Sequence, residues 1–291
     1  MTKGQMLREA MKQERPLLAI GAFDAFTARM AAPAGFRAVY IGSFATAASL
    51  CGLPDFGLLS VTEMADHMRR LAAATPLPCI ADADTGYGNA INVRRTVELY
   101  EAAGVAALHI EDQVTPKKCG HIAGKQVIPA EEMVQKIRAA VSARRDPSFM
   151  IIARTDARAV TGLDDAIARC RLYAEAGADV LFVDAPESVD EIARIGRELA
   201  KTGKKQLFNA ARTGKTPPMT AADVGRLGFD IMIFPIEPLL AAYPAMRAVM
   251  QAIRRDGSPE AMADRLATFA DLNETVGLPD YFEAERQFAV R

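Results

Sequence analysis

The stretch "NVRRTVELYEAAGVAALHIED", residues 92–112, joins a helix pattern, a glycine and a strand pattern in immediate succession. Its first part repeats apolar residues at helical spacing and stops at Gly104, as helix C-termini commonly do. Its last part, residues 107–112, is a short apolar run that ends in two acids. A similar Glu-Ala-Gly joint recurs at residues 175–178. Both stretches predict an amphipathic helix that leads directly into a buried strand.

Apolar runs of this kind alternate with helical patterns along most of the chain. Continuous apolar strands separated by amphipathic helices are typical of a parallel sheet that helices cover. Eight such units in about 235 residues favour a closed (β/α)8 TIM barrel, an α/β fold, over an open sheet. The strands are expected at residues 17–20, 38–41, 78–82, 107–112, 149–155, 179–185, 206–210 and 230–235.

The sequence after the last strand is surplus to a barrel. It begins with one long helical pattern, "PLLAAYPAMRAVMQAIRRDG", and continues with the amphipathic tail "SPEAMADRLATFADLNETVGLPDYFEAERQF". We therefore expect a barrel domain at residues 1–255 and a helical extension at 256–291. The apolar residues of the tail predict packing against a partner subunit, with a cap on its own subunit as the alternative.

The composition excludes several classes of function. No apolar run reaches the roughly 20 residues of a membrane span, and a net charge of −1 gives no electrostatic basis for binding nucleic acid or an acidic membrane. The polar first residues lack a secretory signal pattern, which predicts a cytoplasmic protein. The four cysteines have no metal-type spacing and are expected as thiols, with Cys51, Cys79 and Cys170 as small core residues.

Polar residues at the strand ends point to a site, because this barrel class carries its chemistry at the carboxyl ends of the strands. Asp82 and Asp84 follow the third strand and Glu111 ends the fourth. Oxygen ligands of this kind suit Mg²⁺, with Mn²⁺ as an alternative cation. The other interpretation is that these acids pair with Arg154 and loop lysines. Further polar residues at strand ends are Ser43, Asp112, Asp156, Asp184, Glu187 and Asn209.

Two further features predict chemistry. Arg154 emerges from the apolar strand "FMIIART" and is interpreted as a clamp for a substrate carboxylate, with a structural ion pair as the alternative. In the loop "TPKKCGHIAGK", residues 115–125, Cys119 lies between lysines and His121. Positive neighbours favour a thiolate and the glycines would let the loop open and close, so we expect a catalytic cysteine rather than an inert one.

With these residues in view, the chain resembles the isocitrate lyase and phosphoenolpyruvate mutase superfamily. The stretches that carry the resemblance are "DADTGYGN", "HIEDQVTPKKCGH", "ARTDAR", "GLPDFGLLSVTEM" and "GLPDYFEAERQF". The resemblance implies a Mg²⁺-dependent barrel whose last helices are exchanged between subunits of a homotetramer. The Lys-Lys-Cys-Gly-His loop places the chain in the carbon–carbon lyase branch, which includes methylisocitrate lyase, 2,3-dimethylmalate lyase and the petal death protein.

The resemblance also implies roles for individual residues. Asp82 and Asp84 would hold Mg²⁺, and Glu111 would assist through water. Cys119 would act as general acid, and the catalytic group would also contain Arg154, His121 and Glu111. The substrate, a small dicarboxylate or tricarboxylate, would contact Gly42, Ser43, Phe44, Asp55, Gly120, Glu187 and Asn209.

Two departures from the family pattern bear on the substrate. Ser43-Phe44 stands where related lyases have a double glycine, and Arg212 stands where they have a glutamate. Both favour a smaller or differently charged diacid over methylisocitrate. We predict cleavage of a 2-hydroxy dicarboxylate to a keto acid and a carboxylic acid. The alternatives are oxaloacetate hydrolysis or decarboxylation, carboxyphosphonoenolpyruvate mutase chemistry, and a barrel that binds a metal–diacid complex without turning it over.

Overall fold

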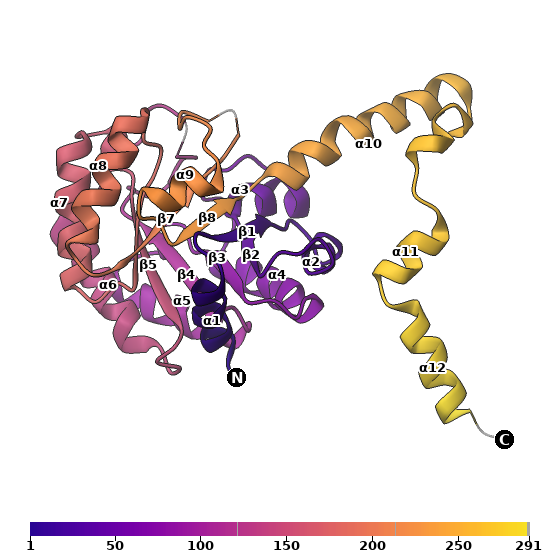
Figure 1. Cartoon of the computed structure of the whole chain (residues 1–291), viewed down its shortest axis with the longest axis horizontal. Coiled ribbons are helices and arrows are strands. Elements are labelled where there is room, and N and C mark those ends of the chain that lie inside the picture. Colours follow the sequence, from indigo (N-terminus) through magenta and orange to yellow (C-terminus); the bar gives the residue numbers. More distant parts are fainter. Residues whose placement is uncertain (121, 213, 290–291) are drawn as a thin grey trace. The chain divides into compact units, whose positions relative to one another are not determined.

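The computed structural model describes residues 1–120, 122–212 and 214–289 (Figure 1). Its strands form a closed barrel in which each strand pairs in parallel with the next and β8 pairs with β1. This confirms the predicted (β/α)8 barrel. The strands are β1 (Leu17–Gly21), β2 (Ala38–Ile41), β3 (Cys79–Asp82), β4 (Ala107–Glu111), β5 (Met150–Thr155), β6 (Val180–Val183), β7 (Lys205–Asn209) and β8 (Ile231–Phe234).

Helices connect the strands and surround them (Figure 1). The joint that follows residues 92–101 has the predicted form, since Gly104 takes a φ of 85° and Gly177 a φ of 104° where their helices end. A left-handed residue at this position is easiest for glycine. The elements of the barrel are α1 (Lys3–Gln13), α2 (Ala25–Ala31), α3 (Ser43–Thr46), η1 (Ala47–Cys51), α4 (Val61–Ala74), α5 (Ala90–Ala102), α6 (Ala130–Ala143), η2 (Ala157–Ala159), α7 (Leu163–Glu175), α8 (Val189–Ala200) and α9 (Ala221–Arg226).

The strands are buried on both faces, which explains their continuous apolar sequences. In β1, Leu17 and Ala19 belong to one apolar cluster, made mainly of strand residues together with some of α1, whereas Leu18 and Ile20 pack against a second cluster that includes helix residues such as Met64. Alternate residues of a strand point to opposite faces, so the first cluster fills the barrel and the second lies beneath the helices.

The first helix, α1, closes the amino-terminal end of the barrel. Its Leu7 is fully buried and belongs to the cluster inside the barrel. Arg8 pairs with Asp179, which precedes β6, at 3.0 Å. A capping box at Thr2 and Gln5 begins the helix. This end of the barrel is therefore sealed, and the opposite end remains for the site.

The contacts divide the chain into a unit at Met1–Glu237 and a second unit at Pro238–Arg291. The division falls at the start of α10 (Glu237–Asp256), whereas the sequence pattern had grouped this helix with the barrel. The second unit continues with η3 (Glu260–Arg265), α11 (Phe269–Thr275) and α12 (Leu278–Phe288). None of the described residues of η3, α11 or α12 is buried.

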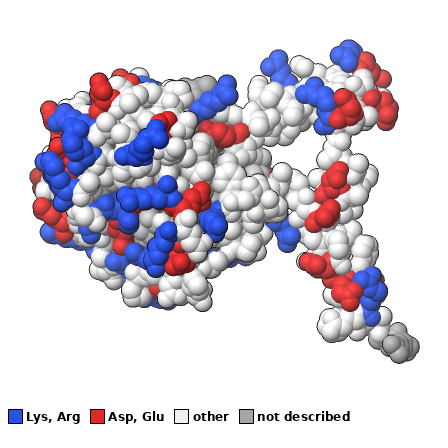
Figure 2. Space-filling model, in the orientation of Figure 1, with Lys and Arg blue, Asp and Glu red and all other residues white. Residues whose placement is uncertain are grey.

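Basic and acidic side chains lie next to one another on the face of the barrel seen in Figure 2. Ion pairs of the barrel include those between α7 and α8, namely Arg171 with Glu198 and Arg194 with Asp164. Across the described residues, no helix combines the length and the apolar character that crossing a membrane requires.

The cysteines confirm most of the prediction and correct one part of it. None of them forms a disulfide, and Cys79 and Cys170 are buried as expected. Cys51, in contrast, is exposed. It ends η1, a short helical turn after β2 that has no apolar periodicity, so its neighbours in the sequence gave no sign that it faces solvent.

Candidate active site

Three acids meet at the carboxyl end of the barrel. Asp82 ends β3, Asp84 follows it, and Glu111 ends β4. All three side chains are buried. The backbone holds them together, since Asp84 N–H donates to the Asp82 carboxylate at 2.9 Å and Glu111 N–H donates to the Asp84 carbonyl, also at 2.9 Å.

Asp82 lies among hydrogen-bond donors. The Ser43 hydroxyl and the Ser43 N–H donate to its Oδ2 at 2.8 and 3.1 Å. Burial by itself raises the pKa of Asp82, but His109, Lys117 and Arg154 together outweigh this effect and hold that pKa below its ordinary value. Asp82 is therefore ionised at neutral pH.

Asp84 and Glu111 have the opposite tendency. Burial, supported by the negative charges of Asp82 and Asp55, raises the pKa of Asp84 to about 6 against the lowering effect of Lys117. Burial also raises the pKa of Glu111 well above its usual range, although Arg154 lowers it. Asp84 adopts a φ of 45°, a left-handed conformation that is strained for a residue with a side chain. Strain of this kind gathers at functional sites.

Lys117 and Asp55 lie beside these acids. Lys117 Nζ is 3.0 Å from Asp84 Oδ1, makes a short contact with Asp55, and donates to the Ser43 hydroxyl at 2.8 Å. Burial lowers the pKa of Lys117, but Asp84 and Asp55 raise it well above its ordinary value. The ammonium group is therefore charged, although the side chain is almost fully buried.

Arg154 pairs with carboxylates from three strands. Its guanidinium contacts Glu111 at 3.1 Å, Asp156 at 2.9 Å and Asp184 at 3.0 Å. The guanidinium carbon also lies 5.3 Å from the centre of the Phe182 ring. The ion pairing considered as an alternative in the sequence is thus present. It fixes a cation at the mouth, where a substrate carboxylate would meet it.

The charges of the mouth do not balance. If each acid were ionised, six buried carboxylates among the described residues would face three buried cations. Burial, together with the like charges around them, raises the pKa values of Asp84 and Glu111, and a further cation at the mouth would lower both. The carboxylates are Asp55, Asp82, Asp84, Glu111, Asp156 and Asp184, and the cations are Lys117, Lys125 and Arg154.

The donor set fits a hard divalent cation. Within the described residues, Asp84 Oδ1 and both carboxylate oxygens of Glu111 are buried and accept no hydrogen bond of good geometry, although Asp84 has an ion-pair partner in Lys117 at 3.0 Å and Glu111 has one in Arg154 at 3.1 Å. No group of three or more His, Cys, Asp or Glu side chains in residues 1–120, 122–212 and 214–289 has the geometry to hold a metal ion. Mg²⁺, however, keeps several waters and often takes only one or two carboxylates from the protein.

A second ring of contacts holds the end of β5 in place. The Asp112 carboxylate accepts hydrogen bonds from the Thr155 hydroxyl at 2.7 Å, the Asp156 N–H at 2.9 Å and the Tyr173 hydroxyl at 2.7 Å. Arg169 of α7 reaches the same carboxylate at 3.2 Å. These contacts orient the strand that carries Arg154.

Inside the barrel, below the acids, lie His109 and Tyr40. The Tyr40 hydroxyl and His109 Nε2 are 2.8 Å apart, and the same nitrogen lies 3.6 Å from Asp82 Oδ1. The two rings stack with a centroid distance of 5.8 Å. This pair supports Asp82 from beneath.

The loop after β4 reaches the same mouth. A Cβ atom on Gly120 would lie 1.7 Å from Asp184 Oδ2 and 2.6 Å from an Arg154 nitrogen, so only glycine fits there. Cys119, next to it, is half-buried. His121, which the sequence placed in the catalytic group, lies outside the described residues.

The other predicted site residues are less uniform. Asn209 donates to Asp184 Oδ1 at 3.1 Å and so joins the cluster. Gly42 caps α3, close to the ring of Tyr40, and Phe44 in α3 is partly exposed. Glu187 is exposed and pairs with Arg158 at 2.8 Å and Lys215 at 3.4 Å. No contact described here links Glu187 to the acids of the mouth.

Sequence reasoning left out several members of the cluster. The sequence places Asp156 and Asp184 at strand ends and predicts no role for them. In the structure both are buried and pair with the Arg154 guanidinium. The sequence presents the loop lysines as positive neighbours of Cys119 and as alternative partners of the acids, without singling out Lys117 or Lys125. Both are buried at 4 % and 8 % exposure. A lysine within a run of loop glycines gives no sign of burial, because its partners Asp55 and Asp156 are distant in the sequence.

Comparisons with known proteins agree with this geometry. The family model described as phosphoenolpyruvate phosphomutase matches residues 7–254. A 2,3-dimethylmalate lyase of Eubacterium barkeri is 42 % identical, and the match covers 99 % of both chains. A 2-methylisocitrate lyase of Halalkalibacterium halodurans is also 42 % identical over 97 % of this chain and 92 % of that protein.

Solved structures extend the likeness to the fold. A crystal structure of 2,3-dimethylmalate lyase superimposes with a TM-score of 0.92 at 38 % identity, covering 99 % of this chain and 96 % of that one. Phosphonopyruvate hydrolase in complex with oxalate and Mg²⁺ gives a TM-score of 0.90 at 33 % identity over the whole of both chains. Barrel, acidic mouth and relatives together show that this chain belongs to the phosphoenolpyruvate mutase/isocitrate lyase superfamily.

Proposed function

We propose that this enzyme of the lyase type cleaves the C2–C3 bond of a 2-hydroxy dicarboxylate of the alkylmalate or methylisocitrate kind. The products would be an α-keto acid and a carboxylic acid. The observation that carries the proposal is the excess of buried carboxylates over buried cations at a mouth that also holds Lys117 and Arg154. Relatives named as dimethylmalate and methylisocitrate lyases support it.

Asp82 and Asp84 would hold a divalent cation, Mg²⁺ or Mn²⁺, and Glu111 would assist through water. When bound, the cation would supply a Lewis acid for the 2-hydroxy and carboxylate end of the substrate. A phosphonopyruvate hydrolase structure with oxalate and Mg²⁺ is among the structural neighbours. The buried oxygens of Asp84 and Glu111 that accept no hydrogen bond of good geometry suit this role.

The remaining steps belong to side chains of the mouth. A carboxylate accepts the proton of the 2-hydroxyl group, and we assign this role to Glu111. Cleavage of C2–C3 leaves an electron pair on C3 that spreads into the adjacent carboxylate. Arg154 and Asn209 would stabilise this negative charge. Cys119 then gives C3 a proton, which completes the carboxylic acid product.

A panel of diacids tests the proposal. Keto-acid release would be measured with 2,3-dimethylmalate, methylisocitrate, isocitrate, citramalate and oxaloacetate, each with and without a chelator. We expect a 2-hydroxy diacid to give metal-dependent keto-acid release. Turnover of oxaloacetate alone would favour hydrolysis or decarboxylation, and release from none of the diacids would overturn the proposal.

The departures from the family pattern bear on which diacid is taken. The Ser43 hydroxyl bonds with Asp82 at 2.8 Å and with Asp55 at 3.2 Å, so it fills space beside the acids that a glycine would leave open. Arg212 follows β7, and its N–H donates to Glu237 at 3.0 Å. Both departures favour a smaller or differently charged diacid over methylisocitrate. A methyl group in a pocket changes binding by about 1–3 kcal/mol, so the panel has to decide.

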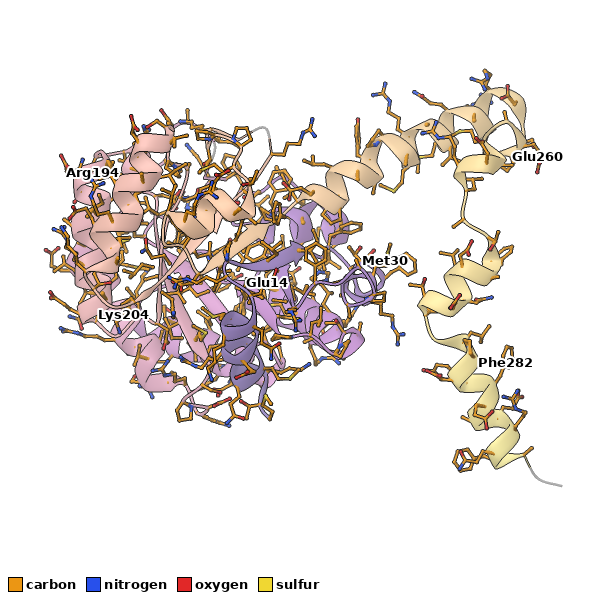
Figure 3. All side chains as sticks on the ribbon, in the orientation of Figure 1. Glu14, Met30, Arg194, Lys204, Glu260 and Phe282 are labelled. Atoms are coloured by element: carbon orange, nitrogen blue, oxygen red, sulfur yellow. The ribbon has the colours of Figure 1, made fainter. Side chains whose placement is uncertain are left out.

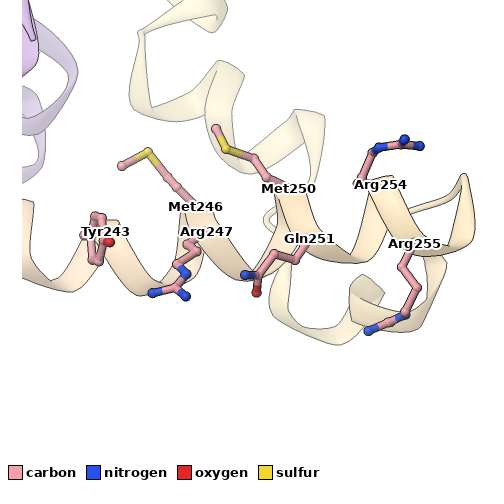
Figure 4. A pocket seen from close by; sticks show the side chains of 7 residues that line it. All are labelled: Tyr243, Met246, Arg247, Met250, Gln251, Arg254 and Arg255. Carbon is pink, nitrogen blue, oxygen red and sulfur yellow. The ribbon is translucent and has the colours of Figure 1, made fainter.

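We also propose that the C-terminal unit packs on a second copy of the chain. On α10, Met246 and Met250 point to the same side of the helix (Figure 4) and are 45 % and 66 % exposed. On α12, Phe282 projects from the helix and is half-exposed (Figure 3). A cavity of about 630 Å³ lies along α10, lined by Tyr243, Met246, Arg247, Met250, Gln251, Arg254 and Arg255. Exposed apolar side chains grouped on neighbouring helix turns are expected at an interface.

A further inference from the structure

We propose that Lys125 is a positioning residue that holds the Cys119–Gly120 segment and Arg154 in register through Asp156. Lys125 has been given no catalytic, cation-holding or substrate-binding role above; its partners are Asp156 and the backbone carbonyl of Gly120, a predicted substrate contact. This inference deepens the proposed lyase function and rests on it, although its main test does not depend on catalysis.

The ammonium group of Lys125 has two partners from different parts of the chain. It donates to the Gly120 carbonyl in a short contact, and it pairs with Asp156 Oδ1 at 2.8 Å. The Lys125 side chain is 2 % exposed and that of Asp156 is fully buried. A buried lysine is seldom retained without a partner, because removing its charge from water is costly. Both of these partners belong to the mouth.

Asp156 bonds to both Lys125 and Arg154, and so links the position of Arg154 to that of Lys125. Its Oδ1 accepts from Lys125 and also from an Arg154 terminal nitrogen at 3.1 Å, while its Oδ2 accepts from Arg154 Nε at 2.9 Å. A carboxylate that accepts hydrogen bonds from two nitrogens of a guanidinium group fixes the plane of that guanidinium group. Burial raises the pKa of Asp156, but Arg154 and Lys125 lower it below its ordinary value. Lys125 thus offsets part of the negative charge that surrounds Arg154.

Gly120 connects Lys125 with Asp184 and Arg154. Its carbonyl is held by Lys125, and its α-carbon lies so close to Asp184 and Arg154 that no methyl group would fit. Arg154 in turn bonds to Asp184 at 3.0 Å and to Asp156. Loss of Lys125 would release the Gly120 carbonyl and leave Asp156 shared by fewer donors. Cys119, adjacent to Gly120, would then lose its fixed place over the mouth.

The test measures how fast iodoacetamide alkylates Cys119. It uses the full chain in a Cys51→Ser background, because Cys51 is the other cysteine that is not buried. We expect Lys125→Met to raise the alkylation rate at least fivefold and Lys125→Arg to leave it within twofold. In Gly120→Ala the added methyl group has no room, so the alkylation rate of this variant shows how a displaced Cys119–Gly120 segment behaves. Lys205→Met, which removes a lysine–aspartate pair at the other end of the barrel, should have no effect.

Three further measurements separate positioning from a loss of fold. Cys79 and Cys170 are buried, so mass spectrometry should find them unlabelled in every variant. Lys125→Gln, which keeps N–H donors, should give a smaller rise than Lys125→Met. Adding Lys125→Met to Asp156→Asn should raise the rate by less than twofold, because residues that act through one another are not additive. An alkylation rate in Lys125→Met within twofold of the parent would overturn the inference.

Activity gives an independent readout. If the chain releases keto acid as proposed, Lys125→Met should lower kcat at least tenfold, and Lys125→Arg should restore most of it. A faster alkylation of Cys119 together with an inactive parent enzyme would refute the lyase proposal but leave the positioning role intact. Unchanged alkylation in an active enzyme would refute the positioning role alone.

Discussion

At the scale of single residues, the acids of the mouth differ in their surroundings although their side chains are alike. Asp82 accepts hydrogen bonds from Ser43 and from the Asp84 N–H, whereas the Glu111 carboxylate accepts none among the described residues. Burial without such donors favours the neutral acid. The same cluster therefore contains a carboxylate that stays ionised and others that need a cation in order to ionise.

Asp84 predicts how Mg²⁺ binding depends on pH. Its pKa is raised to about 6, so below pH 6 the group is protonated and a cation must displace its proton. The apparent affinity for Mg²⁺ should therefore weaken by roughly tenfold per pH unit below 6. Calorimetric titrations at pH 5 and pH 7 check this. Equal affinities at the two pH values would mean that Asp84 is no ligand.

Cys119 predicts a loss of turnover without loss of metal. In Cys119→Ser, a hydroxyl of much higher pKa replaces the thiol, and kcat should fall by roughly 10²- to 10⁴-fold, the usual contribution of a general acid. Mg²⁺ binding should persist. Cys51→Ser, a change at the exposed end of η1, is the control and should keep full activity. Near-normal turnover in Cys119→Ser would remove the thiol from the mechanism.

At the scale of elements, the sequence predicted most of the barrel because local patterns decide it. Apolar runs ended by polar residues located the strands to within two residues of their observed bounds, and the joint at Gly104 located the end of α5. The short elements α3 and η1 escaped notice because four or five residues are too few to show a period. The pairing of Lys125 with Asp156 also escaped, because only the fold brings residues 31 positions apart to one place.

The network behind β5 predicts a large stability effect. Asp112→Ala would leave the Arg169 charge and the Thr155 and Tyr173 hydroxyls without a shared acceptor. Breaking a buried ion pair on one side typically costs about 3–5 kcal/mol, which urea unfolding would measure. Glu198→Ala, at a surface pair, should cost less than about 1 kcal/mol. Equal effects in the two variants would contradict this account of the β5 support.

At the scale of the whole molecule, the C-terminal unit is distinguished by how much of its aromatic side chains is exposed. Phe269, Tyr281 and Phe288 are 86 %, 71 % and 76 % exposed, although aromatic side chains usually find burial. The sequence indicated this surplus of apolar surface, since the tail had nothing obvious to cover. It could not fix which subunit the tail packs on, because an apolar helix face is equally suited to either.

The oligomeric state tests the role of the tail. Phe282→Asp would place a charge in the proposed interface, and light scattering after size exclusion should show a shift from oligomer towards monomer at micromolar concentration. Ile91→Asp makes the same kind of change at an exposed apolar residue of α5 and should leave the oligomer unchanged. A monomeric parent protein would contradict the proposed packing on a second copy.

Binding of a divalent cation by Asp82 and Asp84 is the claim on which the proposed chemistry depends, and calorimetric titration with MgCl₂ tests it most directly. The account predicts one Mg²⁺ per chain in the parent protein and no measurable binding in Asp82→Ala. Asp66→Ala, which removes a surface acid paired with Arg69 and Arg70, should bind as the parent does. Intact Mg²⁺ binding in Asp82→Ala would contradict the account.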